Sequence, residues 1–280
     1  THESPSIVQG FYQGVHEKRQ ELGPGIMPDG KWIPLVLTGF FFLVFPPLWA
    51  GQEDESRDRG FSELIVKTKM SIVAVGTYYY NDTPKGRYLG TGFIISDGRR
   101  VVTNYHVIEP VLEKKKTAFL RIFHKQLPNR GIKARILATD TFHDLAILEH
   151  QGDPLPAMVI ADSTRVREGY KVAFTGYPLG LVLGLNPTTH VGIISSIAPM
   201  VRPSPSSRLI DGSLIKHLND PYEVFQIDAT AYPGNSGSPV YRVATGDVVG
   251  VINKVFVKGK KEHAISQPTG ITYAIPARFV

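Results

Sequence analysis

The chain has 280 residues and no cysteine, and this absence removes two classes of chemistry. Without cysteine there is no disulfide framework to hold a small core, and no thiol can act as a nucleophile. The fold must therefore be stabilised by packing alone. Apolar residues make up 42% of the sequence, which is enough for the core of one large or two modest domains and does not fit a disordered or fibrous protein.

Metal-binding and nucleic-acid-binding signatures are also missing. His16-Glu17 is not followed by a second histidine four residues after the first, and the other histidines show no metal-ligand spacing. We therefore predict no metal and no cofactor. The formal net charge is +6, but the densest basic clusters, residues 114–116 and 258–261, are not interleaved with aromatic residues that could stack on bases. We predict solvated loops and no nucleic-acid partner, with an anionic membrane or cell-wall surface as the alternative.

Long apolar runs are scarce, and the main one spans residues 33–50. It is short for a spanning helix, contains three prolines, and follows the basic Lys31, which is the pattern of a secretory signal cleaved after Ala50. An uncleaved membrane anchor is the alternative. Both predict an extracytoplasmic protein, periplasmic or secreted. We assign residues 1–50 to an upstream segment with this signal or anchor, and the charged residues 51–60 to a flexible linker.

Beyond residue 60 the sequence consists of short apolar or alternating runs bounded by Gly, Pro, Asn and Asp, a pattern typical of strands. Few helical periods are present, so we predict an all-β fold of barrels or sandwiches. The break at residues 151–154 divides this part into two similar halves, 61–152 and 153–280, and residues 200–222 form a long surface loop. The predicted strands are 71–79, 92–96, 100–103, 118–123, 132–138, 145–148, 171–175, 191–197, 224–227, 248–257 and 271–275.

Two motifs in the first half carry a histidine and an acid. The apolar run 101–108 delivers His106 into a turn, and imidazole suits a general base because its pKa lies near neutrality. Asp144 opens the apolar strand that follows it, where a carboxylate could accept the Nδ1 proton of an imidazole and fix its tautomer. Asp140 and His143 lie close by, but neither opens directly onto the apolar strand.

The third motif, residues 231–240, is the strongest local signal. Ser236 lies between Asn235 and Gly237, with Gly234 just before, so the backbone can make a tight turn in which successive N–H groups converge on one point. An ordinary turn remains the alternative, because these are also common loop residues. The order His, Asp, Ser matches the chymotrypsin arrangement and not that of subtilisins or α/β-hydrolases, whose elbow would also require glycine at Ser238.

Over roughly residues 62–276 the chain resembles the trypsin-like peptidases of the HtrA (Deg) family. The resemblance implies two six-stranded Greek-key β-barrels of the trypsin-like type, with His106 and Asp144 from the first and Ser236 from the second. It also implies an oxyanion hole formed by Gly234 and Ser236, with Asn235 between them. It rests on motifs in the family's order, at residues 91–96, 103–107, 144–148, 176–180, 190–195, 226–229, 231–240 and 273–276.

The resemblance predicts a serine endopeptidase of HtrA-like protein quality control, acting on proteins or peptides, especially unfolded segments, through an acyl-enzyme. Two departures are Ser238, where a second glycine is common, and Tyr232, which leaves the substrate preference open. Many relatives continue into PDZ domains, so we expect the sequence to be a fragment, and a homo-oligomer is a further hypothesis. The alternatives are a catalytically silent peptide-binding or scaffold module, and an enzyme activated only when the 200–222 loop is rearranged.

Overall fold

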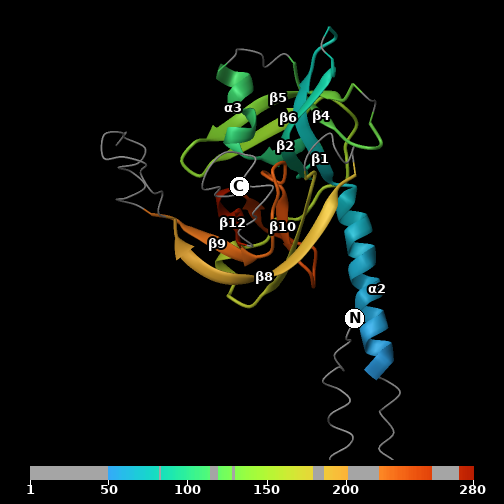
Figure 1. Cartoon of the computed structure of the whole chain (residues 1–280), viewed down its shortest axis with the longest axis vertical. Coiled ribbons are helices and arrows are strands. Elements are labelled where there is room, and N and C mark those ends of the chain that lie inside the picture. Colours follow the sequence, from blue (N-terminus) through green and yellow to red (C-terminus); the bar gives the residue numbers. More distant parts are fainter. Residues whose placement is uncertain are drawn as a thin grey trace, which may run out of the picture. The chain divides into compact units, whose positions relative to one another are not determined.

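A computed structural model of the chain describes residues 50–81, 83–113, 119–127, 130–178, 186–200, 221–253 and 271–280. These residues belong to one compact unit, residues 49–280. They form two closed six-stranded barrels, which confirms the predicted all-β, two-barrel fold (Figure 1).

The first barrel is built from strands in the order β1-β2-β3-β6-β5-β4. Because β4 pairs with β1, the first four strands lie in the spatial order 4-1-2-3, which is a Greek key. Valine, isoleucine and leucine side chains fill the interior, and helix α3 (Tyr105–Glu113) packs against them with its buried face. The strands are β1 (Ile72–Tyr78), β2 (Gly86–Ile95), β3 (Arg100–Thr103), β4 (Leu120–Phe123), β5 (Ile132–Asp140) and β6 (Leu145–His150).

The second barrel repeats this connectivity, with β10 beside β7 as β4 lies beside β1. The predicted strand pattern missed only β10 in the described part of the barrel, because its sequence follows a Gly-Ser pair and starts at Pro239. Proline is compatible with the first residue of a strand. The elements are η2 (Ser163–Arg165), β7 (Lys171–Gly176), β8 (Thr188–Pro199), β9 (Glu223–Asp228), β10 (Pro239–Arg242), β11 (Val248–Ile252), β12 (Ile271–Pro276) and η4 (Ala277–Phe279).

The two barrels share a buried interface. One hydrophobic cluster joins residues of both, including Phe93 from β2 and Val251 from β11. The connection between the barrels follows this seam, because Met158 N donates to Ile94 O of the first barrel and Ala161 N donates to Val248 O of the second. The barrels are therefore fixed relative to each other by packing and by main-chain hydrogen bonds.

The prediction of a flexible charged linker at residues 51–60 is wrong, because these residues belong to helix α2 (Ala50–Lys69). The sequence places Glu53 and Glu55 four residues before Arg57 and Arg59, a spacing and orientation that favour a helix. Later in the helix, Phe61 and Leu64 pack against the hydrophobic cluster at the seam between the barrels. This burial supplies the stabilisation that the charged sequence did not suggest.

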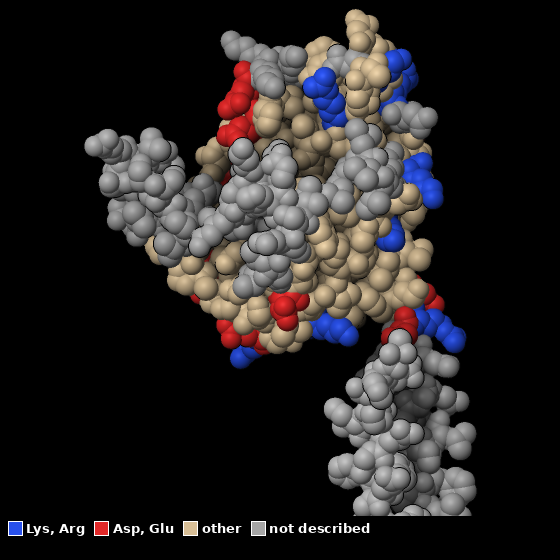
Figure 2. Space-filling model, in the orientation of Figure 1, with Lys and Arg blue, Asp and Glu red and all other residues tan. Residues whose placement is uncertain are grey.

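Several predictions fall outside the described residues. They include the apolar run to residue 49 and both lysine clusters. Most of the long loop also lies outside, although its ends are close, since Met200 N donates to Tyr222 O. None of the helices in the described ranges has the length and apolarity needed to cross a membrane. On the face seen in Figure 2, described basic side chains lie mainly along one edge of the first barrel, and both signs of charge occur around the second.

Candidate active site

His106 lies in the first turn of helix α3, directly after strand β3 and Asn104. The sequence predicted a turn at this point, and the structure continues that turn into a helix. Asn104 is fully buried, and its Nδ2 donates to Asp144 O at 3.0 Å, while Tyr105 N donates to the same oxygen at 3.1 Å. The start of α3 is thereby fastened to the residue that precedes β6.

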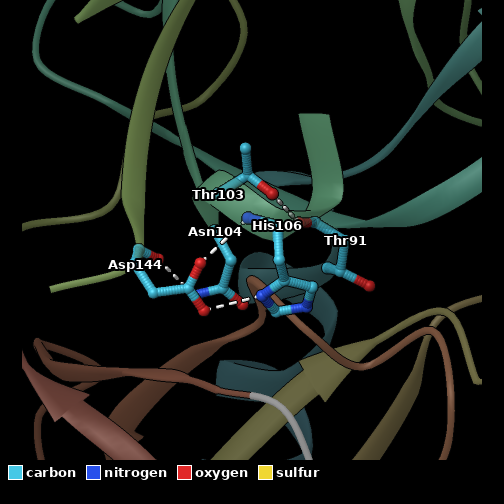
Figure 3. A network of polar contacts seen from close by, with 5 residues as sticks. All are labelled: Thr91, Thr103, Asn104, His106 and Asp144. Carbon is cyan, nitrogen blue, oxygen red and sulfur yellow. Dashed lines mark hydrogen bonds and ion pairs between the residues drawn. The ribbon is translucent and has the colours of Figure 1, made fainter. Parts of the chain in front are cut away.

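Asp144 holds His106 by both its backbone and its ring. The Oδ1 atom accepts from His106 N at 2.9 Å, and Oδ2 accepts from His106 Nδ1 at 2.6 Å. Figure 3 shows the carboxylate directed at the imidazole from the end of the neighbouring strand. With Nδ1 engaged in this way, the tautomer that carries the proton on Nδ1 is favoured, and Nε2 is left as the basic nitrogen.

Asp144 is 7% exposed and has a φ of 56°, in the left-handed region. Aspartate tolerates this region better than most residues, but it is still costly. The conformation is held by the two hydrogen bonds to its carbonyl oxygen described above. It turns the carboxylate back toward α3 at the point where β6 begins.

Ser236 lies in the turn between β9 and β10. Gly234 and Gly237 both have positive φ, 103° and 87°, as the flanking glycines led us to expect. Within the turn, Asn235 N donates to Tyr232 O, and Gly237 N donates to Ile252 O of β11. Among the described residues, no acceptor is found for the N–H groups of Gly234 and Ser236.

The serine turn is attached to the barrel that carries the histidine. Thr91 N on β2 donates to Ser236 O at 2.9 Å, and Thr91 Oγ1 donates to Gly234 O at 2.7 Å. A Cβ on the neighbouring Gly90 would lie 3.0 Å from Ser236 O and 2.7 Å from Val107 Cγ2. The serine backbone and α3 thus flank the same glycine. Within the described residues, the Ser236 hydroxyl and the His106 ring are not hydrogen-bonded to each other, and such contacts are often long in unliganded sites.

Asp140 and His143, which the sequence did not favour, also form a pair, with Oδ2 and Nδ1 2.6 Å apart. Burial alone would raise the pKa of Asp140, but hydrogen bonds from the His143 ring and backbone outweigh it and lower this pKa. The His143 ring stacks on Phe279 at 3.9 Å and meets Tyr222 edge-on at 4.7 Å. This pair therefore joins the turn before Asp144 to the second barrel.

The sequence missed the supporting role of Thr91 and Tyr177. Tyr177 N donates to Thr91 Oγ1 at 3.0 Å, and its hydroxyl donates to Ile72 O at 3.2 Å. Burial raises the pKa of Tyr177, which keeps the phenol protonated and able to donate. Both residues lie in motifs that carry the family resemblance, at residues 91–96 and 176–180. A sequence motif does not show, however, that these two residues are hydrogen-bonded to each other across 86 residues of chain.

The arrangement can activate a hydroxyl. An imidazole oriented by a carboxylate can take a proton, and two backbone donors beside a serine can stabilise an oxyanion. In the described ranges, no three His, Cys, Asp or Glu side chains are grouped so as to hold a metal ion.

Known proteins resemble this chain in sequence and in fold. A family described as a trypsin-like peptidase domain matches residues 90–251. Among curated relatives, a probable periplasmic serine endoprotease, DegP-like, of Halomonas elongata is 30% identical over 190 residues, 68% of this chain and 33% of the relative. Its namesake of Rickettsia conorii is 34% identical over 198 residues, 70% of this chain and 33% of the relative. The chain thus spans about a third of the length of these relatives.

Solved structures of other proteases have a similar fold to this chain. An HtrA-type protease, AlgW, solved with a tripeptide, has a TM-score of 0.53 at 23% identity, covering 78% of this chain and 60% of that one. Deg5 has a TM-score of 0.54 at 25% identity, covering 81% of this chain and 91% of that one. With the family match over more than half of the sequence, these findings show that the chain belongs to the trypsin-like peptidases, as an HtrA-like serine protease.

Proposed function

We propose that the chain is an active serine endopeptidase in which Ser236 is the nucleophile, His106 the general base and Asp144 the residue that orients the base. The observation that carries this proposal is the 2.6 Å contact between His106 Nδ1 and Asp144 Oδ2, beside a serine turn bonded to the same barrel through Thr91. The Asp140–His143 contact is equally short, but among the described residues it packs against Phe279 and Tyr222 and not beside the strand that holds the serine turn.

In the first half of the reaction, His106 Nε2 takes the proton of the Ser236 hydroxyl as Oγ attacks the scissile carbonyl carbon. The oxyanion that forms is stabilised by the N–H groups of Gly234 and Ser236, on either side of Asn235. The imidazolium, held by Asp144, then gives its proton to the leaving amine. Water attacks the acyl-enzyme with the same base, which releases the acid product and restores the serine.

The substrate class follows from the relatives. Several relatives are named probable periplasmic serine endoproteases, and AlgW was solved with peptides. We therefore infer protein or peptide substrates met outside the cytoplasm, including exposed or unfolded segments as in protein quality control. Residues 33–50 would then direct export or tether the protein, and the two barrels, within 61–152 and 153–280, would act as one catalytic unit.

The test is labelling of the purified chain with a fluorophosphonate, together with cleavage of denatured casein. Wild type should be labelled, and Ser236→Ala should lose labelling and about a million-fold in turnover if the three residues act as a unit. Ser238→Ala is the matched control, because this hydroxyl lies in the same turn, is fully buried and has no hydrogen-bond partner among the described residues. It should keep its labelling.

If folded wild type neither reacts with fluorophosphonate nor cleaves casein, the endopeptidase proposal fails and a silent peptide-binding module is favoured. If labelling appears only after peptides are added, the loop of residues 200–222 becomes the candidate for an activating rearrangement. Equal labelling of Ser236→Ala and wild type would exclude Ser236 as the nucleophile.

A further inference from the structure

Thr91 is the junction at which three parts of the molecule meet. It lies on β2, is fully buried, and makes four hydrogen bonds. Its backbone N donates to Ser236 O, and its backbone O accepts from Thr103 Oγ1 at 2.7 Å. Its hydroxyl donates to Gly234 O and accepts from Tyr177 N at the end of β7. The histidine-bearing barrel, the second barrel and the serine turn therefore all bond to this residue. Figure 3 shows the contact between Thr91 and Thr103 within the first barrel.

The hydroxyl has one direction in which it can donate. The Tyr177 N–H already occupies an acceptor position on Oγ1, so the hydroxyl proton is left for Gly234 O at 2.7 Å. The space beside the hydroxyl is tightly packed, since a Cβ on Gly176 would overlap Ser238 Oγ and lie 2.9 Å from Thr91 Oγ1. The Thr91 hydroxyl is thus held in one orientation.

The bond to Gly234 O fixes a whole peptide plane. Because a peptide unit is planar, the Gly234 carbonyl and the Asn235 N–H turn together. The carbonyl accepts from Thr91 Oγ1, and the N–H donates to Tyr232 O at 3.0 Å, so the unit is held at both ends. Gly234 has no side chain to restrict its backbone and a φ of 103°, so these two bonds supply the restraint that a Cβ would otherwise give.

The two peptide units on either side of this plane carry the N–H groups of Gly234 and Ser236. The Gly234–Asn235 unit is joined to both of them through the Cα atoms of Gly234 and Asn235, so a displacement of this unit would move both donors. Oxyanion donors act through fixed direction, because a donor that must reorient during the reaction loses most of its effect. A hydroxyl on the other barrel that anchors this unit therefore helps to hold both donors in place.

We propose that Thr91 is a positioning residue for the acyl-transfer reaction, whose hydroxyl fixes the Gly234–Asn235 peptide and thereby aims the N–H groups of Gly234 and Ser236. This inference rests on the proposed function. Thr91 does not touch the reacting atoms. Its removal should slow the chemical step and leave binding of the reagent largely unchanged.

The experiment compares Thr91→Ser with Thr91→Ala, which differ from each other only by the hydroxyl. Fluorophosphonate inactivation is measured over a range of reagent concentrations to separate the maximal rate, kinact, from the binding constant, KI. Thr91→Ser should stay within a few-fold of wild type in kinact. Thr91→Ala should fall at least about tenfold in kinact with KI little changed, because removing a single oxyanion donor already costs about a hundredfold or more.

The matched controls are Thr175→Ser and Thr175→Ala. Thr175 is also fully buried, and its hydroxyl bonds Thr189 Oγ1 at 2.8 Å and Tyr241 Oη at 2.9 Å, neither of which belongs to the serine turn. Both pairs of variants should lose thermal stability when the hydroxyl is removed. Of the two alanine variants, only Thr91→Ala should lose kinact.

Equal kinact in folded Thr91→Ala and Thr91→Ser would overturn the inference, and so would an equal loss in Thr175→Ala. If Thr91→Ala does not fold, Thr91→Val retains the branched shape and the strand preference without the donor. Wild-type kinact in that variant would overturn the inference in the same way. Failure of wild type itself to react would instead contradict the proposed function, so the two failures can be told apart.

Discussion

At the scale of single residues, Asp144 combines a strained backbone with a short contact. Its φ of 56° lies in a region that costs an L-residue about 1–2 kcal/mol, although less for aspartate and asparagine. The strain persists because Asn104 and Tyr105 both donate to its carbonyl oxygen. The result is a carboxylate that reaches both the ring and the backbone N–H of His106.

Asp144→Asn should remove the negative charge of the side chain and preserve the left-handed backbone conformation. Asparagine tolerates positive φ, so this variant should unfold at nearly the wild-type urea concentration. Its amide cannot keep the proton on His106 Nδ1 as a carboxylate does, and turnover of casein should fall by about 10⁴. Asp144→Ala should lose comparable activity and, in addition, about 1 kcal/mol or more of unfolding free energy from backbone strain. Casein turnover near wild type in Asp144→Asn would contradict the role given to this carboxylate.

The His–Asp distance alone does not distinguish the proposed catalytic pair from the neighbouring pair. His106–Asp144 and His143–Asp140 have the same 2.6 Å contact, and the two aspartates are four residues apart. The sequence preferred Asp144 because it opens directly onto an apolar strand. In the structure the two pairs differ in their surroundings: one lies beside the strand that holds the serine turn, and the other packs against Phe279 and Tyr222.

At the scale of elements, helix α2 is the part of the fold that the sequence led us to misjudge. Its first half is dominated by charged residues and gives no apolar stripe. The second half provides the anchors: Phe61 and Leu64 pack on the core, and Thr68 is buried. A Cβ on Gly246, in the turn between β10 and β11, would lie 2.6 Å from Leu64 Cδ1. The helix is thus held by contacts with residues nearly two hundred positions away, which periodicity within the helix cannot show.

Leu64→Ala should lower the unfolding free energy by about 1–2 kcal/mol, less than the 2–5 kcal/mol usual for a fully buried leucine because this side chain is only partly buried. Val66→Ala is the control on the same helix. Val66 is 65% exposed, so its substitution should change stability by less than about 0.5 kcal/mol. Urea unfolding of both variants at one pH provides the comparison. Equal effects would mean that α2 does not depend on packing against the barrels.

At the scale of the whole molecule, two histidines should make stability depend on pH. Burial lowers the pKa of His124, an effect partly offset by its hydrogen bond to Lys69 O, and burial also lowers the pKa of His190. The native state therefore binds fewer protons than the unfolded chain once the pH falls below about 6.5, the ordinary histidine value. Because the unfolded state takes up the extra protons, unfolding free energy should decrease as the pH falls from 7.5 to 5.5.

His190→Phe should remove part of this dependence. Phenylalanine preserves a ring to stack on Phe174, whose centroid lies 4.9 Å from that of His190, and it cannot take up a proton. The loss of unfolding free energy between pH 7.5 and 5.5 should shrink in this variant, by at most about 1.4 kcal/mol per pH unit for one proton. Urea unfolding at both pH values measures it. An unchanged difference between the two pH values would show that His190 does not contribute.

By itself, the sequence determined the strand-rich class, most strand positions, and the order of the histidine, aspartate and serine motifs. These follow from the alternation of apolar and polar residues, from turn-forming residues and from short sequence motifs, all of which depend on a few neighbouring residues along the chain. Only the tertiary structure decided that 51–60 is helical, that Pro239–Arg242 is a strand, and that Thr91 bonds Gly234 across 143 residues. Such contacts exist only when two closed barrels meet along a buried seam, because their partners are brought together by packing and pairing of the whole chain and not by the preferences of any one segment.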